Sequence, residues 1–184
     1  MKMSGSETIA ASRDAVWAGL NDPAVLKQCI PGCDSITKDS PTTMTAKASI
    51  KLGPLKVPFK GSVTLSDLKP PESYRIAGQG QGGLAGFASG SAAVKLIALS
   101  ANETQLDYDV DAQVGGKMAM LGARLIDSTA QSLAKQFFMK FANVVKAQSA
   151  KAGKPVAAVP KKSSPKKTVK KSAVKAAKKA VKKK

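Results

Sequence analysis

The chain has 184 residues and a formal net charge of +18 at pH 7, from 30 Lys and Arg against 12 Asp and Glu, and it has no histidine. The length suits one domain, or one domain with a tail. Without histidine, Ser-His-Asp and Cys-His catalysis are excluded. No run reaches the roughly 18 apolar residues of a membrane span, and the first residues lack the apolar core of a secretory signal.

The N-terminal part predicts one strand and two short helices. The strand is expected over residues 3–10. Ser12 is a suitable N-cap for the first helix. Asp22 and Pro23 then break the chain and start a second helix, which we expect to run to about Cys29.

Residues 34–116 predict an antiparallel meander of five or six strands. Apolar residues alternate over 42–52 and again over 57–68, so each segment has one apolar face. Shorter strand-like segments follow, separated by turn residues. They lie at 74–78, 92–99 and 104–114.

The glycine-rich stretch 78–86 invites comparison with a phosphate-binding loop. Such a loop opens a helix and carries Gly-Lys-Ser/Thr, whereas this stretch joins two strand-like segments and lacks that signature. We therefore predict a hairpin with close backbone approach. At the mouth of a cavity it would serve as a mobile lip.

The period becomes helical from about 118 to 147. A helix of about 25 residues is roughly 38 Å long and crosses a whole small sheet. The predicted fold class is therefore α+β, with a curved antiparallel sheet over one long C-terminal helix and a cavity between them.

The last segment, 149–184, is distinct from the domain predicted over 1–148. Its fourteen lysines and lack of acidic residues account for +14 of the net charge, so +4 remains on 1–148. It also has no aromatic residue. Because such a composition buries too little apolar surface to order itself, we predict a disordered, lysine-rich tail.

Several local patterns, in order over roughly 1–146, resemble the CoxG family of carbon monoxide dehydrogenase, within the START/Bet v 1-like (SRPBCC) superfamily. They are Ala15-Val16-Trp17 with Leu20-Asn21-Asp22-Pro23, Cys29-Ile30-Pro31-Gly32-Cys33, Lys51-Leu52-Gly53-Pro54-Leu55 with Phe59-Lys60-Gly61, Gly78-Gln79-Gly80, and Gly115-Gly116-Lys117 with Leu121-Gly122-Ala123-Arg124-Leu125-Ile126.

The resemblance implies a helix-grip fold, in which a seven-stranded antiparallel sheet grips the C-terminal helix around an apolar cavity. It also implies a non-catalytic adaptor. Such a protein would recruit a molybdenum hydroxylase of the carbon monoxide dehydrogenase type to the inner face of the cytoplasmic membrane and couple it to the quinone pool. The expected ligand is a quinone (menaquinone or ubiquinone) or another isoprenoid lipid.

In a helix-grip fold, residues from both the helix and the sheet face the cavity. The candidate ligand-binding residues are Met44, Phe59, Tyr74, Phe87, Leu125, Thr129, Leu133 and Phe137. Hydrogen bonds to a quinone would come from Gln79, Thr129 or Tyr108. The competing interpretation is that these side chains simply fill the interior.

The tail predicts attraction to an anionic surface. If half of its lysines engage an anionic leaflet at about 1 kcal/mol each, the gross attraction is about 7 kcal/mol. The membrane-binding candidates are Lys161, Lys162, Lys166, Lys167, Lys170, Lys171, Lys178, Lys179, Lys182 and Lys183. Nucleic acid offers the same counterion-release attraction and remains the alternative, beside a hydrophobic-ligand carrier unrelated to membranes.

Two other groups have plain interpretations. Cys29 and Cys33 lack the further ligands of a zinc site, so we expect two ordinary thiols near a helix end. Asp107, Asp109 and Asp111 alternate along a predicted strand. They would form a solvated acidic face or a docking patch for a partner, and they lack the loop geometry of a calcium site.

Overall fold

The computed structural model describes residues 1–53 and 55–152. Seven antiparallel strands form one sheet in the order β1-β7-β6-β5-β4-β3-β2. Their bounds are β1 Lys2–Ile9, β2 Cys33–Lys38, β3 Thr43–Leu52, β4 Leu55–Lys69, β5 Ser73–Gln81, β6 Phe87–Ser100 and β7 Glu103–Gly115. Successive strands from β2 to β7 are neighbours, which confirms the predicted meander.

Two short helices connect β1 to β2, as predicted. In α1 (Arg13–Leu20), the Ser12 side chain accepts a hydrogen bond from the backbone N–H of Ala15 at 3.3 Å. In α2 (Pro23–Cys29), Asp22 caps in the same way by accepting from Ala24 N–H at 2.8 Å. Each cap satisfies a backbone donor that the helix itself leaves free.

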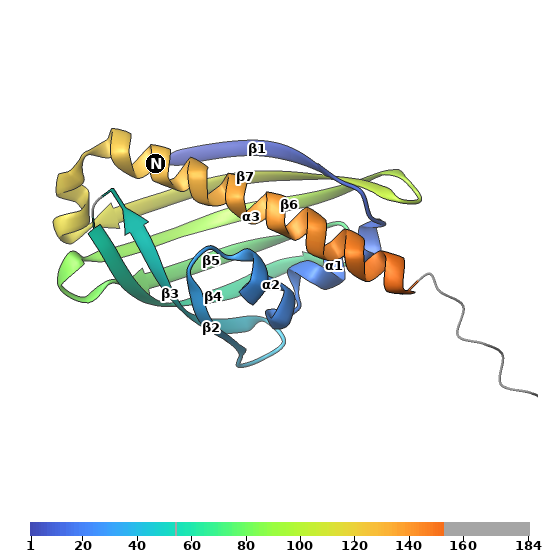
Figure 1. Cartoon of the computed structure of the whole chain (residues 1–184), viewed down its shortest axis with the longest axis horizontal. Coiled ribbons are helices and arrows are strands. Elements are labelled where there is room, and N and C mark those ends of the chain that lie inside the picture. Colours follow the sequence, from blue (N-terminus) through green and yellow to red (C-terminus); the bar gives the residue numbers. More distant parts are fainter. Residues whose placement is uncertain (54, 153–184) are drawn as a thin grey trace, which may run out of the picture. The chain divides into compact units, whose positions relative to one another are not determined.

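The C-terminal segment is a 3-10 helix, η2 (Gly116–Leu121), followed by the long α3 (Ala123–Ala152). The sequence predicted one helix over 118–147. The break occurs at Gly122, whose φ of +87° is a conformation that glycine adopts without steric cost. Figure 1 shows α3 crossing one face of the sheet, which we call the inner face.

The main core lies between the inner face and the C-terminal half of α3, with α1 and α2 closing it. Its fully buried members include Phe141, which is 0% exposed. The larger buried side chains of this core are Ile9, Val16, Leu20, Val25, Met44, Leu65, Tyr74, Val94, Leu96, Leu106, Phe141 and Val145. The alternating positions predicted for β3 and β4 therefore do face the core.

A smaller apolar group, the end cluster, closes one end of the sheet. It consists of Leu52, Val57 and Met118, with Phe59 and Leu121 packed against it. Met118 comes from η2, which thus seals the end where the β3–β4 turn and the β5–β6 loop also lie. We call this end of the domain the loop end (left in Figure 1).

Candidate functional site

A groove of about 380 Å³ runs over the inner face of the sheet, between the main core and the end cluster. Met44, Val63 and Ile76 border it on the side of the main core, and Phe59 on the side of the end cluster. Most of the remaining inner-face positions are small. Nine of them are glycine or alanine, namely Ala46, Ala48, Gly61, Gly78, Gly80, Ala88, Gly90, Ala92 and Ala112.

The small residues explain why the groove exists. Opposite side chains across neighbouring strands normally fill the space above a sheet. Here Gly78 is paired with Gly90, and Ala46 with Gly61. Because these positions carry one carbon or none beyond the backbone, the space above them stays open.

The side chains that face the groove are apolar. Four polar residues also border it (Ser62, Gln79, Ser89 and Ser91), but they occupy the alternate positions of their strands and their side chains point to the opposite face. Among the residues that the structure describes, no Asp, Glu, Lys or Arg borders the groove. Since a buried charge without a partner is costly, the arrangement suits an uncharged, apolar molecule.

Two of the eight predicted cavity residues, Met44 and Phe59, line this groove. Tyr74 lies in the main core instead, 4% exposed, with its ring edge-to-face to Trp17 at 5.3 Å between centroids. Burial raises the pKa of Tyr74 well above its usual value. Phe87 lies at the loop end and is 51% exposed.

The helix residues among the predicted eight also lie outside the groove. Thr129 and Leu133 border a separate hollow beside β3, together with Ser49 and Ile50. Leu125 lies next to the β3–β4 turn, and Phe137 stacks on Phe141 at 5.6 Å in the main core. None of the described side chains of α3 borders the groove. Ligand contact by these residues stays a prediction.

The three predicted hydrogen-bond donors are placed differently from the expectation. Thr129 donates its hydroxyl to the carbonyl oxygen of Leu125 at 2.8 Å. Tyr108 stacks on Phe138 at 5.0 Å and does not border the groove. Gln79 contributes its backbone to the groove wall, and its side chain points away.

The groove-lining glycines and alanines are the residues that sequence reasoning missed. A signal was present, because small residues recur at every second position in 46–48, 78–80 and 88–92. In a strand, that period places them all on one face. The glycine-rich stretch does connect two strands, β5 and β6, through the short 3-10 helix η1 (Gly83–Ala85), which confirms the predicted hairpin.

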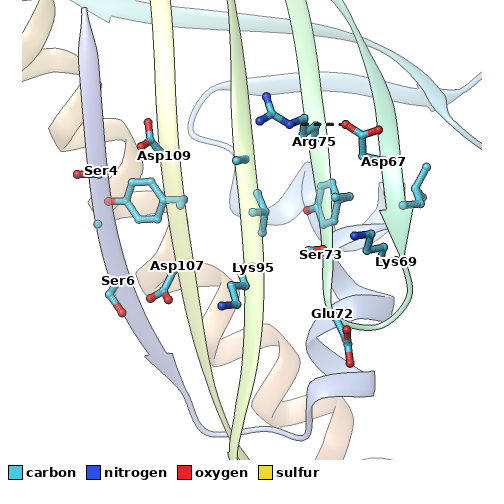
Figure 2. A pocket seen from close by; sticks show the side chains of 16 residues that line it. Ser4, Ser6, Asp67, Lys69, Glu72, Ser73, Arg75, Lys95, Asp107 and Asp109 are labelled. Atoms are coloured by element: carbon cyan, nitrogen blue, oxygen red, sulfur yellow. Dashed lines mark ion pairs between the residues drawn. The ribbon is translucent and has the colours of Figure 1, made fainter.

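A second, wider hollow of about 1010 Å³ lies on the opposite, outer face of the sheet. Figure 2 shows Asp107 and Asp109 of β7 beside Ser4 and Ser6 of β1, and Lys95 on β6. Hydrogen bonds from Ser6 and Gln105 lower the pKa of the Asp107 carboxyl.

The other side of this hollow carries charges of both signs. Arg75 pairs with Asp67 at 3.6 Å, and both side chains are mostly exposed. The predicted acidic face on β7 is therefore present, but cations lie beside it. Within the described residues, no group of three or more Cys, Asp or Glu is arranged to hold a metal ion.

Both thiols are free. Cys29 is buried at the end of α2, and Cys33 is half-buried at the start of β2. Burial raises the pKa of both groups, which is the opposite of what a reactive thiol needs.

The predicted membrane-binding lysines, from Lys161 to Lys183, lie outside the described residues, as does almost all of the tail predicted over 149–184. Within the described ranges, α3 continues to Ala152. No helix in these ranges has both the length and the apolar character required to cross a membrane.

Residues 5–146 match the sequence profile of the CoxG family of carbon monoxide dehydrogenase. Among curated proteins, none is significantly similar to the chain. A solved structure of a conserved protein from Geobacillus kaustophilus has 30% sequence identity and a TM-score of 0.75, over 80% of this chain and 97% of that one.

More distant structures have the same fold. A START superfamily protein from Mycobacterium smegmatis has 14% identity and a TM-score of 0.64, over 80% of this chain and 98% of that one. An aromatase/cyclase from a Streptomyces species has 14% identity and a TM-score of 0.61, over 83% and 98%. The helix-grip fold that the resemblance implied is therefore confirmed.

Proposed function

The chain belongs to the CoxG family of carbon monoxide dehydrogenase, and from this premise we propose that its domain is a non-catalytic carrier of an uncharged apolar ligand in the inner-face groove. The observation that carries this proposal is the groove itself, which small residues keep open and which no titratable side chain of the described ranges borders. Family membership and the START-like fold point in the same direction, toward binding of a hydrophobic molecule.

The composition of the groove also argues against catalysis there. Acid–base and nucleophilic mechanisms need a titratable or nucleophilic side chain within reach of the substrate. The described inner-face positions that border this groove carry only Met, Phe, Val, Ile, Ala and Gly side chains. Because one fold can host both binding and catalysis, as the similar aromatase/cyclase illustrates, we argue from the site and not from the fold.

An isoprenoid quinone fits this proposal best through its chain. The described groove residues offer hydrocarbon contact but no inward-facing side-chain hydrogen-bond donor, and the groove volume is near the lower end of small-molecule sites. The isoprenoid part would lie over the glycines and alanines. The ring, which needs polar partners, would lie toward the open side of the groove.

We further propose that the protein recruits a molybdenum hydroxylase of the carbon monoxide dehydrogenase type to the inner face of the cytoplasmic membrane. Two points support this: membership of the family, and the fourteen lysines of 149–184, each of which gains about 1 kcal/mol near an anionic leaflet. The function would be positional, since it shortens the path between the enzyme and the quinone.

The direct test of ligand binding is native mass spectrometry of the full-length protein purified from its own host, followed by titration of the emptied protein with a short-chain menaquinone. We expect a co-purified isoprenoid and saturable, one-to-one binding. An empty groove in every preparation, together with no saturable binding, would refute the carrier function.

The test of membrane recruitment is flotation with anionic vesicles at ~150 mM salt, where the screening length is about 8 Å. A full-length variant with the ten candidate tail lysines changed to glutamine should float less than the wild type. If the wild type ignores vesicles but binds duplex DNA, the nucleic-acid alternative replaces the membrane proposal, because the same lysines attract phosphate.

A further inference from the structure

The loop end of the domain carries the most exposed apolar side chains that the structure describes. Leu84 is 90% exposed, Met120 is 85% exposed and Phe87 is 51% exposed. They come from three features of the chain, η1, the start of β6 and η2. Large apolar side chains in such an exposed position raise the free energy of the protein in water, so their grouping indicates a contact surface.

Backbone packing holds the elements that carry these side chains together. The β5–β6 loop closes with a hydrogen bond from Gly82 N–H to Gly86 C=O at 2.8 Å. Gly86 lies so close to Gly115 and Gly116 that a β-carbon on it would collide with their backbone. Phe87 in turn covers Gly115. The apolar tip, which we define as Leu84, Phe87 and Met120, is thus built on a close contact between η1 and η2 rather than on separate loops.

The adjoining β3–β4 hairpin adds a concentrated positive charge. On its outer face, Lys47 is paired directly with Lys60, and Lys51 with Lys56, and all four side chains are exposed. Like charges directly opposite each other destabilise a sheet. Two successive pairs of this kind therefore make sense when an anionic partner offsets the repulsion.

No acidic residue accompanies these lysines. The segments 44–65, 76–92 and 112–126, which form the loop end and the strands leading to it, contain no Asp or Glu, although the chain has twelve. Lys117 and Arg124 add two more exposed cations there. The acidic residues all lie elsewhere, many of them toward the opposite end of the sheet.

We propose that the loop end is a second membrane contact, in which Leu84, Phe87 and Met120 insert among the acyl chains of an anionic bilayer while the lysine pairs meet its headgroups. An apolar tip with neighbouring cations matches the layered chemistry of such a surface. An acidic protein would match the lysines but not an apolar tip without hydrogen-bond donors. The inference rests on the proposed function only in taking the partner to be a lipid surface.

This contact would orient the domain. Phe59 borders the inner-face groove and packs against the end cluster, and Ala88 of the groove follows Phe87 of the tip. A domain seated on its loop end therefore brings one end of the groove close to the bilayer. A lipid ligand would then move between bilayer and groove over a short apolar path.

Tip insertion can be measured separately from attachment by the tail. In full-length protein, Leu84→Trp places a fluorophore in the tip, and Ala101→Trp places one in the exposed β6–β7 turn at the opposite end. Trp17 contributes the same background to both. With vesicles of phosphatidylcholine and phosphatidylglycerol, we expect a blue shift and quenching by brominated acyl chains for Leu84→Trp only.

The charged part of the surface has its own matched control. Lys51→Gln with Lys56→Gln removes two charges from the loop end, whereas Lys27→Gln with Lys69→Gln removes two exposed charges elsewhere. The first pair should weaken vesicle binding by roughly fivefold for each lysine, the equivalent of the approximate gain of one lysine at an anionic surface. The second pair should change it much less.

Three results would overturn the inference. One is an unshifted and unquenched Leu84→Trp on vesicles that nevertheless bind the protein. Another is equal weakening by the two lysine pairs, and the third is equal insertion into phosphatidylcholine alone. Each of these would leave quinone binding by the groove and attachment by the tail untouched, so failure here is distinguishable from failure of the proposed function.

Discussion

Filling the groove from within should abolish ligand binding without unfolding the protein, and Ala92 is the position to use. Its side chain borders the groove on β6. Ala92→Leu adds three carbon atoms, which occupy about 80 Å³ at the density of a protein interior, or roughly a fifth of the 380 Å³ groove. Because the new atoms enter open space, the free energy of unfolding should change by no more than about 1 kcal/mol.

The expected loss of affinity follows from the ligand atoms that the leucine displaces. Three ligand methylene groups at ~0.8 kcal/mol each amount to about 2.4 kcal/mol, which is roughly a 60-fold higher Kd. The assay is titration with a short-chain menaquinone, combined with urea unfolding. Ala93→Leu is the matched control, because Ala93 is the next residue on the same strand and borders the outer hollow instead.

The comparison of the two leucine variants also decides where the ligand lies. If Ala92→Leu is folded and binds menaquinone as tightly as the wild type, the inner-face groove is not the site. If Ala93→Leu instead weakens binding, the ligand lies in the outer hollow.

Further predictions concern stability and reactivity. Phe141→Ala should lower the free energy of unfolding by about 3–5 kcal/mol, measured by urea unfolding, because Phe141 is fully buried; a loss below ~1 kcal/mol would contradict its place in the main core. Thr104 is buried and donates a 2.8 Å hydrogen bond to a main-chain carbonyl, so Thr104→Val should cost about 1–3 kcal/mol while Thr104→Ser retains most of the stability. Burial raises the pKa of Tyr74 in the folded state, so above about pH 10 the unfolded chain loses this proton first and stability falls as pH rises. In alkaline urea titrations, Tyr74→Phe should flatten that fall, and an unchanged slope would argue against it. Cys33 is more exposed than Cys29 and should react first with a thiol reagent in the native state; equal rates would indicate that α2 opens readily.

Much of the fold followed from local patterns. Alternation along 42–52 and 57–68 predicted two strands with one apolar face each, and Ser12 and Asp22 predicted helix starts. These features depend on residues close together in the chain, since side-chain direction alternates with period two in a strand and a cap bonds within its own first turn. The family resemblance supplied the remaining strands and the helix-grip arrangement.

The candidate site was harder to predict because it depends on which segments meet. Large side chains such as Tyr74 and Phe137 were expected at the cavity, but aromatic rings are the groups that close packing draws into a core. Open space arises where side chains are small, so the groove lies over Gly78, Gly80 and their alanine neighbours. Sequence reasoning that looks for large apolar residues finds the core and overlooks the groove.

The sequence by itself determined the charge division of the chain, the strand faces and the helix starts, because each of these is a property of composition or of near neighbours. Only the tertiary structure decided that the described part of the long helix does not border the groove. Its contacts with the sheet are set by Phe137, Phe138 and Phe141 meeting the main core, and such long-range packing is not encoded in any local pattern. The same holds for the loop end, where hairpins and a 3-10 helix far apart in the chain bring exposed apolar side chains and paired lysines to one end of the domain.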